Sequence, residues 1–416
     1  MKILHTVQTY LPERNGMAEV VRQLSERLVK KGHQVVVATS ANPLRTEKVM
    51  AGVEVVEFDV QGSITGGIRG EYDRYMDFIR TQQFDIMTNF AAQQWATDLV
   101  FPLLNEIKAK KVFVPTGFSA LFLEQFRGYF ERMKTWLKQY DMNVFLAEDY
   151  RDSRFAREAG VENWVLIPNG AAEDEFLSSH YEGNIRQKLG IYASDYLVLH
   201  VGDFTGIKGH LEAIQIFSQA HIQNAVLVMV SSSFDHIQTN YPVMVKEILR
   251  SILRRPNRFK YQPRFEILEI ARIKAMAGNR IKNKRIIYAC LTRKDTVAAF
   301  MAADLFLFPS NIESSPIVLF ESAASRTPFL SSDVGNAGEI ARWTGGGQIL
   351  PTVHEKTGLG LSHVDVADSA KMLELLWQDR PRGKAMGDAA FNAWRQKFTW
   401  ERIADQYEAL YAGLLK

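Results

Sequence analysis

MAADLFLFPSNIESSPIVLFESAASRTPFLSSDVGNAGE, residues 301–339, has the pattern of a buried strand, a polar loop and a partly buried helix. The apolar run 304–309 predicts a short strand of a parallel sheet, and Pro316 stands where the first turn of a helix can begin. The apolar positions of that helix are Ile317, Leu319, Phe320 and Ala324. Glu313 therefore falls in the loop at the strand's carboxyl end, and Glu321 lies on the helix about two turns later. Ligands of open α/β sheets bind at that edge.

This junction favours a ligand that carries both phosphate and sugar. Free backbone N–H groups at the start of a helix attract an anion. Two flanking carboxylates, Glu313 and Glu321, can accept hydrogen bonds from several sugar hydroxyls without a metal. The alternative is that they are an ordinary loop glutamate and a solvated helix-face glutamate, and the spacing taken alone leaves it open.

The spacing resembles a known motif. Pro309-Ser310 precedes Glu313, and an aliphatic run separates it from Glu321, as in the E-x7-E motif of the retaining glycosyltransferases of family 4. The resemblance implies the α/β GT-B fold, in which two doubly wound Rossmann-like domains face each other. It also implies transfer of a sugar from a nucleotide-diphosphate sugar with retention of its anomeric configuration.

Further segments resemble the same family in the same order along the chain. Residues 1–7 read as a first buried strand, and residues 11–19 are similar to the family's glycine-rich acceptor-side loop, with Asn15 in place of the usual first glycine and Gly16 kept. Residues 167–170, Ile-Pro-Asn-Gly, match the segment that closes the first domain. The resemblance thus covers almost the whole chain.

The second half supplies the expected phosphate contact. Residues 197–203 begin the second domain in the family's pattern, and Lys208 follows after a short turn. A lysine there supplies a point charge for a diphosphate. The family usually has an arginine where this chain has Asp203, so Arg293 or Lys294 is a candidate for the second cation.

Two more departures alter the expected contacts. Pro316 lacks the N–H that the family's usual glycine offers, so the amides of Ile317 and Val318 and the hydroxyls of Ser314 and Ser315 are expected to bind the diphosphate. The family commonly carries a histidine near residues 112–117, and this chain has none there. Thr116 or Ser119 is expected to contact the donor sugar instead.

The resemblance assigns the roles. Lys208 and Glu313 are the expected catalytic residues, Glu321 accepts from the ribose, and the base contacts backbone near Leu291. The departing phosphate oxygen takes the acceptor's proton on the same face, so no protein nucleophile is assigned. The expected donor site comprises Gly16, Asp203, Lys208, Leu291, Glu313, Ser314, Ser315, Pro316, Ile317, Val318 and Glu321, and the acceptor side comprises Asn15, Thr116 and Ser119.

Length and composition agree with two domains. A chain of 416 residues with 46% hydrophobic residues can form two cores. We expect the first domain at residues 1–175, the nucleotide-sugar domain at 185–390, and a closing helix within 391–416 that returns to the first domain. A basic insertion is expected near 240–285.

Other sequence features limit the function classes. The single cysteine, Cys290, lies in the apolar strand pattern of residues 286–290 and is expected to be a small buried hydrophobe. No phosphate loop, dinucleotide fingerprint or metal-ligand pattern occurs, which favours a metal-independent reaction without a cofactor. No apolar run approaches the length of a membrane span, which predicts a cytoplasmic protein and leaves open a peripheral position on the inner face of the membrane.

Two segments bear on partners. Residues 118–140 interleave aromatic and basic side chains, which suits a membrane surface or a groove for a lipid-linked acceptor, or an ordinary core-facing helix. Residues 246–285 carry thirteen Lys or Arg against three Glu, an excess of ten in a chain of formal net charge +3. That charge could attract anionic lipid or nucleic acid, or be merely solvated.

The sequence leaves two rival functions. A nucleotide-sugar epimerase would share the architecture but needs acid and base groups that the sequence does not assemble. A nucleic-acid-binding protein would use residues 246–285. The preferred prediction is transfer to a saccharide or lipid-linked acceptor in cell-surface polysaccharide or glycolipid synthesis.

Overall fold

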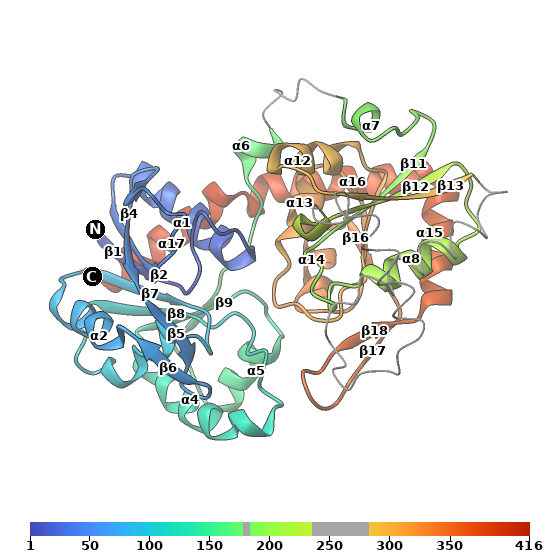
Figure 1. Ribbon diagram of the computed structural model, residues 1–416. Helices are drawn as coiled ribbons and strands as arrows, with labels where there is room; N and C mark the ends of the chain where they lie inside the picture. Colours follow the sequence, from blue (N-terminus) through green and yellow to red (C-terminus); the bar gives the residue numbers. More distant parts are fainter. Residues whose placement is uncertain (178–183, 235–282) are drawn as a thin grey trace.

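A computed structural model describes residues 1–177, 184–234 and 283–416. The chain forms two α/β bodies joined by two crossings, and both termini lie on the first body (Figure 1). The basic insertion and its helical pattern fall outside the described residues, apart from residues 283–285.

The first body is built on a sheet with the strand order β10-β9-β8-β7-β1-β2-β4-β3. Its strands are β1 (Lys2–Thr6), β2 (Gln34–Ser40), β3 (Val49–Met50), β4 (Val53–Phe58), β7 (Ile86–Phe90), β8 (Lys110–Val114), β9 (Met142–Phe145) and β10 (Trp164–Leu166). All described pairs are parallel except β3 with β4. A small hairpin joins β5 (Val60–Ser63) to β6 (Gly67–Gly70), and the helices are α1 (Gly16–Lys30), α2 (Tyr72–Thr81), α3 (Trp95–Asp98), α4 (Arg127–Gln139) and α5 (Arg151–Glu158).

The second body has an all-parallel sheet with the order β13-β12-β11-β14-β15-β16. Its strands are β11 (Tyr196–Val201), β12 (Ala225–Val230), β13 (Lys284–Ala289), β14 (Leu305–Phe308), β15 (Phe329–Ser331) and β16 (Gly347–Ile349). The antiparallel pair β17 (Thr352–His354) and β18 (Ser362–Val364) lies beside it. The described helices are α6 (Glu173–Phe176), α7 (Ile185–Lys188), α8 (His210–Gln219), α12 (Arg293–Ala302), α13 (Ile317–Ala324), α14 (Ala337–Thr344), α15 (Val366–Gln378) and α16 (Arg380–Ala393).

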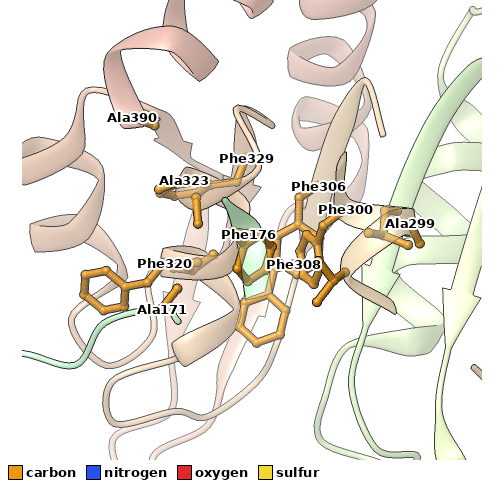
Figure 2. Packing of buried hydrophobic residues seen from close by; sticks show 14 of the residues in the cluster. Ala171, Phe176, Ala299, Phe300, Phe306, Phe308, Phe320, Ala323, Phe329 and Ala390 are labelled. Atoms are coloured by element: carbon orange, nitrogen blue, oxygen red, sulfur yellow. The ribbon is translucent and has the colours of Figure 1, made fainter. Parts of the chain in front are cut away.

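Apolar packing fixes the junction that the sequence singled out. Phe306 and Phe308 of β14 lie beside Phe300 and Phe176, and α13 packs alongside (Figure 2). Leu319, Phe320 and Ala323 are fully buried in this cluster. Burying one phenylalanine side chain stabilises a fold by about 1.5–3 kcal/mol, so both ends of the intervening loop are held firmly.

The last helix returns to the first body, as expected. After the π-helical turn Trp394–Phe398, helix α17 (Trp400–Leu414) packs on α1 and buries Trp400, Ile403 and Tyr407 in the first domain's core. The close approach at this crossing needs Gly170, because a Cβ there would lie 2.3 Å from the carbonyl oxygen of Phe398. These two parallel-sheet bodies and the returning helix confirm the predicted architecture, whereas the domain boundaries stay a prediction.

Cys290 is a correction. Strand β13 ends at Ala289, so Cys290 is the first residue beyond the strand and is exposed. The prediction that Cys290 is a buried strand residue is therefore wrong, because the strand ends one residue before it.

Candidate functional site

The Glu313 side chain is held in place by two neighbours. Its Oε1 atom accepts from Lys208 Nζ at 2.7 Å and from Ser310 Oγ at 2.9 Å. Glu313 is 12% exposed and Lys208 is 29% exposed, so the pair is partly shielded from water. The loop between β11 and α8 thus meets the loop between β14 and α13.

A glycine permits that meeting. Gly209 has φ +74°, and a Cβ on it would lie 2.1 Å from the carbonyl oxygen of Pro309. Any other residue would be strained in this backbone conformation, and its Cβ would collide with Pro309. The Lys208-Gly209 pair in the sequence therefore brings the lysine to the carboxylate.

A cavity of about 310 Å³ opens beside this pair, between the two bodies. Its lining comprises Gly16, Met17, Val20, Thr116, Leu146, Asn169, Val201, Gly202, Asp203, Lys208, Phe308, Glu313, Ser314, Ser315, Pro316, Ile317 and Val318. Ten of the predicted site residues therefore share one cavity: Gly16, Thr116, Asp203, Lys208, Glu313, Ser314, Ser315, Pro316, Ile317 and Val318.

The other four predicted residues lie outside this lining. Asn15 caps helix α1, where its Oδ1 atom accepts from the Ala18 amide at 2.9 Å. Ser119 is exposed on the first body, Leu291 packs on the second domain's core, and Glu321 is almost fully buried. Sequence order alone did not reveal these different placements.

The cavity's second-domain wall favours an anion. Pro316 precedes helix α13, and the first amides of the helix, Ile317 and Val318, have no acceptor within the helix. The buried Ser315 Oγ atom has no hydrogen-bond partner among the described residues. Lys208 is the cation of this lining. Asp203, in place of the family's usual arginine, is exposed and its Oδ1 atom accepts from Ser232 Oγ at 3.0 Å.

A buried histidine supports this wall and was missed by sequence reasoning. His210 Nε2 lies 3.1 Å from the carbonyl oxygen of Gly202, and its ring contacts His200 edge-on at 4.6 Å. Burial lowers the pKa of His200 to about 4 and holds that of His210 well below its usual value, so both rings are neutral. The signal that could have found it is its position directly after Lys208-Gly209.

Strained backbone gathers on the first-domain side. Ala91, Gln93, Thr116 and Phe118 all have φ between 48° and 64°, a region that residues with side chains rarely adopt. They follow β7 and β8, and Thr116 among them lines the cavity. Each such residue costs on the order of 1–3 kcal/mol, and clusters of them are typical of functional sites.

Contacts from the first domain and the linker hold the Glu313 segment. The Tyr150 hydroxyl donates to the carbonyl oxygen of Glu313 at 2.5 Å, and Asn169 Nδ2 donates to that of Ser315 at 3.0 Å. Glu339 of α14 accepts from the amides of Glu148 and Asp149, each at 2.8 Å. The two bodies therefore contact each other next to the candidate site.

A second cavity of about 350 Å³ adjoins the first, with Glu313 in the lining of both. It lies between α5 and the β17–β18 pair, and its lining includes Phe122, Asp149, Tyr150, Arg151, Arg154, Asp333 and His354. Arg151 closes one side by donating to the carbonyl oxygens of Leu359 and Gly360 at 2.9 and 2.7 Å.

Glu321 lies in an ion-pair network. Arg293 Nη2 is 2.5 Å from Glu321 Oε1, and Arg293 Nε donates to Glu175 Oε2 at 3.0 Å. Arg293, a candidate for the second diphosphate cation, does not line the 310 Å³ cavity. Arg293 and Glu321 are far apart in the sequence, and no local pattern indicated their pairing.

The aromatic residues of 118–140 mostly face the core. Trp136 stacks on Phe101 with ring centroids 4.3 Å apart, and Tyr129 and Phe130 are buried, whereas Arg127 and Lys134 are exposed. No helix of the described residues is long and apolar enough to cross a bilayer. Across the same described ranges, no group of three His, Cys, Asp or Glu side chains is arranged to hold a metal.

The chain resembles curated proteins of two kinds. N-acetyl-alpha-D-glucosaminyl L-malate synthase of Bacillus anthracis is 22% identical over 436 residues, covering 98% of this chain and 96% of that protein. D-inositol 3-phosphate glycosyltransferase of Corynebacterium aurimucosum is 34% identical over 122 residues, and that match spans 29% of this chain and 26% of the relative.

Solved structures share the fold. Sucrose-phosphate synthase from Thermosynechococcus elongatus has a TM-score of 0.73 at 16% identity, over 100% of this chain and 99% of that one. Anabaena Alr3699/HepE in complex with UDP-glucose has a TM-score of 0.69 at 15% identity, over 99% and 100%. The family described as glycosyl transferases group 1 matches residues 182–392, just over half of the chain. The chain therefore belongs to the glycosyl transferases group 1 family and has its GT-B fold, as the ordered motifs predicted.

Proposed function

We propose that this protein is a retaining glycosyltransferase that moves a sugar from a nucleotide-diphosphate sugar to a saccharide or lipid-linked acceptor. One observation carries the proposal: Glu313, fixed by Lys208, borders an interdomain cavity whose wall includes the start of helix α13. Carboxylate, cation and free amides at one place match the hydroxyls and phosphates of such a donor. The Anabaena protein bound to UDP-glucose supports this donor class.

In this proposal the diphosphate binds Lys208, the Ile317 and Val318 amides and the Ser315 hydroxyl. Negative charge grows on the leaving diphosphate as the glycosidic bond breaks, and these groups stabilise it. We expect Lys208 and these neutral donors to do so without a divalent metal. Glu313 accepts from hydroxyls of the donor sugar and orients its anomeric carbon.

The acceptor enters through the 350 Å³ cavity, because Glu313 borders both cavities. Its hydroxyl attacks the anomeric carbon from the leaving group's face and gives its proton to the departing phosphate oxygen, so the configuration is retained. Thr116 contacts the donor sugar. Closure of the two domains around the bound donor excludes water that would hydrolyse it. We assign the reaction to cell-surface polysaccharide or glycolipid synthesis on the cytoplasmic side, since the exposed Arg132 and Lys138 of α4 suit an anionic lipid surface.

The test is a thermal-shift and calorimetric screen of the whole chain against uridine, guanosine and adenosine diphosphate sugars, followed by product analysis with sugar acceptors. We expect the diphosphate sugar of one of the three nucleosides to bind. Its nucleoside diphosphate should be released only when an acceptor is present. Epimerised donor without nucleotide release would instead indicate an epimerase. Binding to none of the donors would refute the proposal.

A further inference from the structure

We propose that Arg293 is a positioning residue for Glu321, holding this carboxylate ionised and oriented so that it can accept from the ribose of the donor. The inference rests on the proposed function, because it takes Glu321 to be the group that accepts from the ribose of the nucleotide donor. It goes beyond that function by naming the residue that keeps the buried carboxylate of Glu321 ionised for this contact.

Arg293 forms a close ion pair with the buried Glu321. Arg293 is the first residue of α12, and its Nη2 atom lies 2.5 Å from Oε1 of Glu321, on the neighbouring helix α13. The Glu321 side chain is only 5% exposed, so water solvates little of its charge. The ion pair therefore fixes the orientation of the carboxylate relative to α12.

The same guanidinium is shared with the linker. Arg293 Nε donates to Oε2 of Glu175 on α6 at 3.0 Å, and Arg22 Nη2 of α1 lies 3.7 Å from the other oxygen of Glu175. Arg22 in turn pairs with Glu19 at 2.7 Å and with Glu26 at 3.2 Å. This network contains four glutamates and two arginines, so it holds more negative than positive charge when all are ionised.

Glu321 is the member that depends most on Arg293. Burial raises the pKa of Glu321, Arg293 opposes that rise, and the charges of Glu175 and Glu19 add to it. Removing the guanidinium would leave a buried carboxylate facing two other carboxylates, which favours uptake of a proton. A protonated carboxyl loses acceptor capacity and cannot serve the ribose hydroxyls equally well.

The alternative role, a direct diphosphate contact, does not fit this geometry. Among the described residues, the ion pairs of Arg293 go to two carboxylates, those of Glu175 and Glu321, so its charge is already compensated. Its ring contact with Phe176, with the guanidinium carbon 6.0 Å from the centroid, keeps it on the linker side. Arg293 therefore acts through Glu321 rather than on the phosphates.

The experiment measures binding of UDP, GDP and ADP to the whole chain, and then compares the tightest of them with its 2′,3′-dideoxy form from pH 6 to 9. For Arg293→Met we expect about 10-fold weaker binding at pH 7, no remaining preference for the ribose form, and recovery of both as the pH rises. Arg293→Lys keeps a charge and should keep the wild-type pH profile. Glu175→Gln removes the competing carboxylate and should bind at least as well as wild type.

The matched control is Arg285→Met. Arg285 Nη2 lies 2.8 Å from Oδ2 of Asp195, a side chain only 4% exposed, so this change also strips a guanidinium from a buried carboxylate of the second body. It should leave nucleotide binding and its pH profile unchanged. Circular dichroism of each variant reports folding.

Two results would overturn the inference. An Arg293→Met variant that keeps the ribose preference and the wild-type pH profile would show that Arg293 does not act through Glu321. Tighter binding by that variant would show that Arg293 competes with the ribose. Failure of the wild type to bind any of the three nucleotides is a separate outcome, since it refutes the proposed function and the inference together.

Discussion

Lys208 Nζ and Glu313 Oε1 lie 2.7 Å apart although 105 positions separate them in the chain. The pair joins the two loops that follow β11 and β14, at adjacent positions of the second sheet. A cation for phosphate and a carboxylate for sugar hydroxyls thus sit in contact, and the first two predictions separate their roles.

Replacing Glu313 with glutamine should abolish most transfer without unfolding the protein. The change keeps the volume but removes the charge, and a hydrogen bond to a charged group is worth about 1.5–3 kcal/mol, so we expect a loss of at least about 10-fold in kcat/KM. Glu131→Gln is the control, because Glu131 forms a comparable pair with Lys134 at 2.9 Å on the exposed surface. Full activity of the Glu313 variant in a product assay would contradict its role.

Replacing Lys208 with methionine should weaken binding of the nucleoside diphosphate by about 10- to 100-fold, because a charge-assisted contact to phosphate is lost. Binding of the nucleoside alone should not change. Calorimetry with both ligands checks this, with Lys134→Met as the surface control. An equal effect on both ligands would remove Lys208 from the phosphate role.

Replacing Gly209 with alanine should disrupt the meeting of the two loops. The new Cβ would lie 2.1 Å from the carbonyl oxygen of Pro309, so the loops must separate. Gly190→Ala is a close control, because Gly190 has φ +64° with nothing within 4 Å of its Cβ. It should cost only about 1–2 kcal/mol of unfolding free energy, from backbone strain.

We expect the Gly209 variant to lose more unfolding free energy than the Gly190 variant and to bind nucleotide more weakly. Chemical denaturation and calorimetry give the two quantities. Equal losses in the two variants would mean that the contact with Pro309 is not needed.

Asp152 gives a pH prediction. Its Oδ2 atom accepts from the Gly117 amide at 2.7 Å beside the strained Thr116, and burial raises its pKa from 3.8 to about 6. An acid whose pKa is higher in the folded protein stabilises the fold only while protonated. Its contribution is present below pH 3.8 and is lost as the pH rises through about 6.

The unfolding free energy of the wild type should therefore fall relative to that of Asp152→Asn by about 2 kcal/mol between pH 4.5 and 7.5. Urea unfolding at both pH values measures it. Asp149→Asn should show no such change, because hydrogen bonds from Arg154 and the neighbouring charges lower the pKa of Asp149 to about 2, below this range. A rise of the wild type relative to Asp152→Asn would contradict the assignment.

The sequence predicted those parts of the site that local chemistry fixes. The apolar run at β14, Pro316 before the helix and the buried positions of α13 set a strand, a loop and a helix in order, and the parallel sheet then puts Glu313 at its carboxyl edge. Lys208-Gly209 was identified by its similarity to the family's pattern, and the structure shows that glycine is needed at that turn. The family follows from this ordered set of motifs.

The tertiary structure decided everything that depends on which elements meet. Asn15 became a helix cap, Ser119 stayed on the surface, and Cys290 fell just past the end of its strand. Glu321 acquired Arg293, and through Glu175 a connection to α1. Periodicity reports how one element buries its own face, whereas an ion pair between distant residues arises only when packing brings their helices together, and no local pattern encodes that distance.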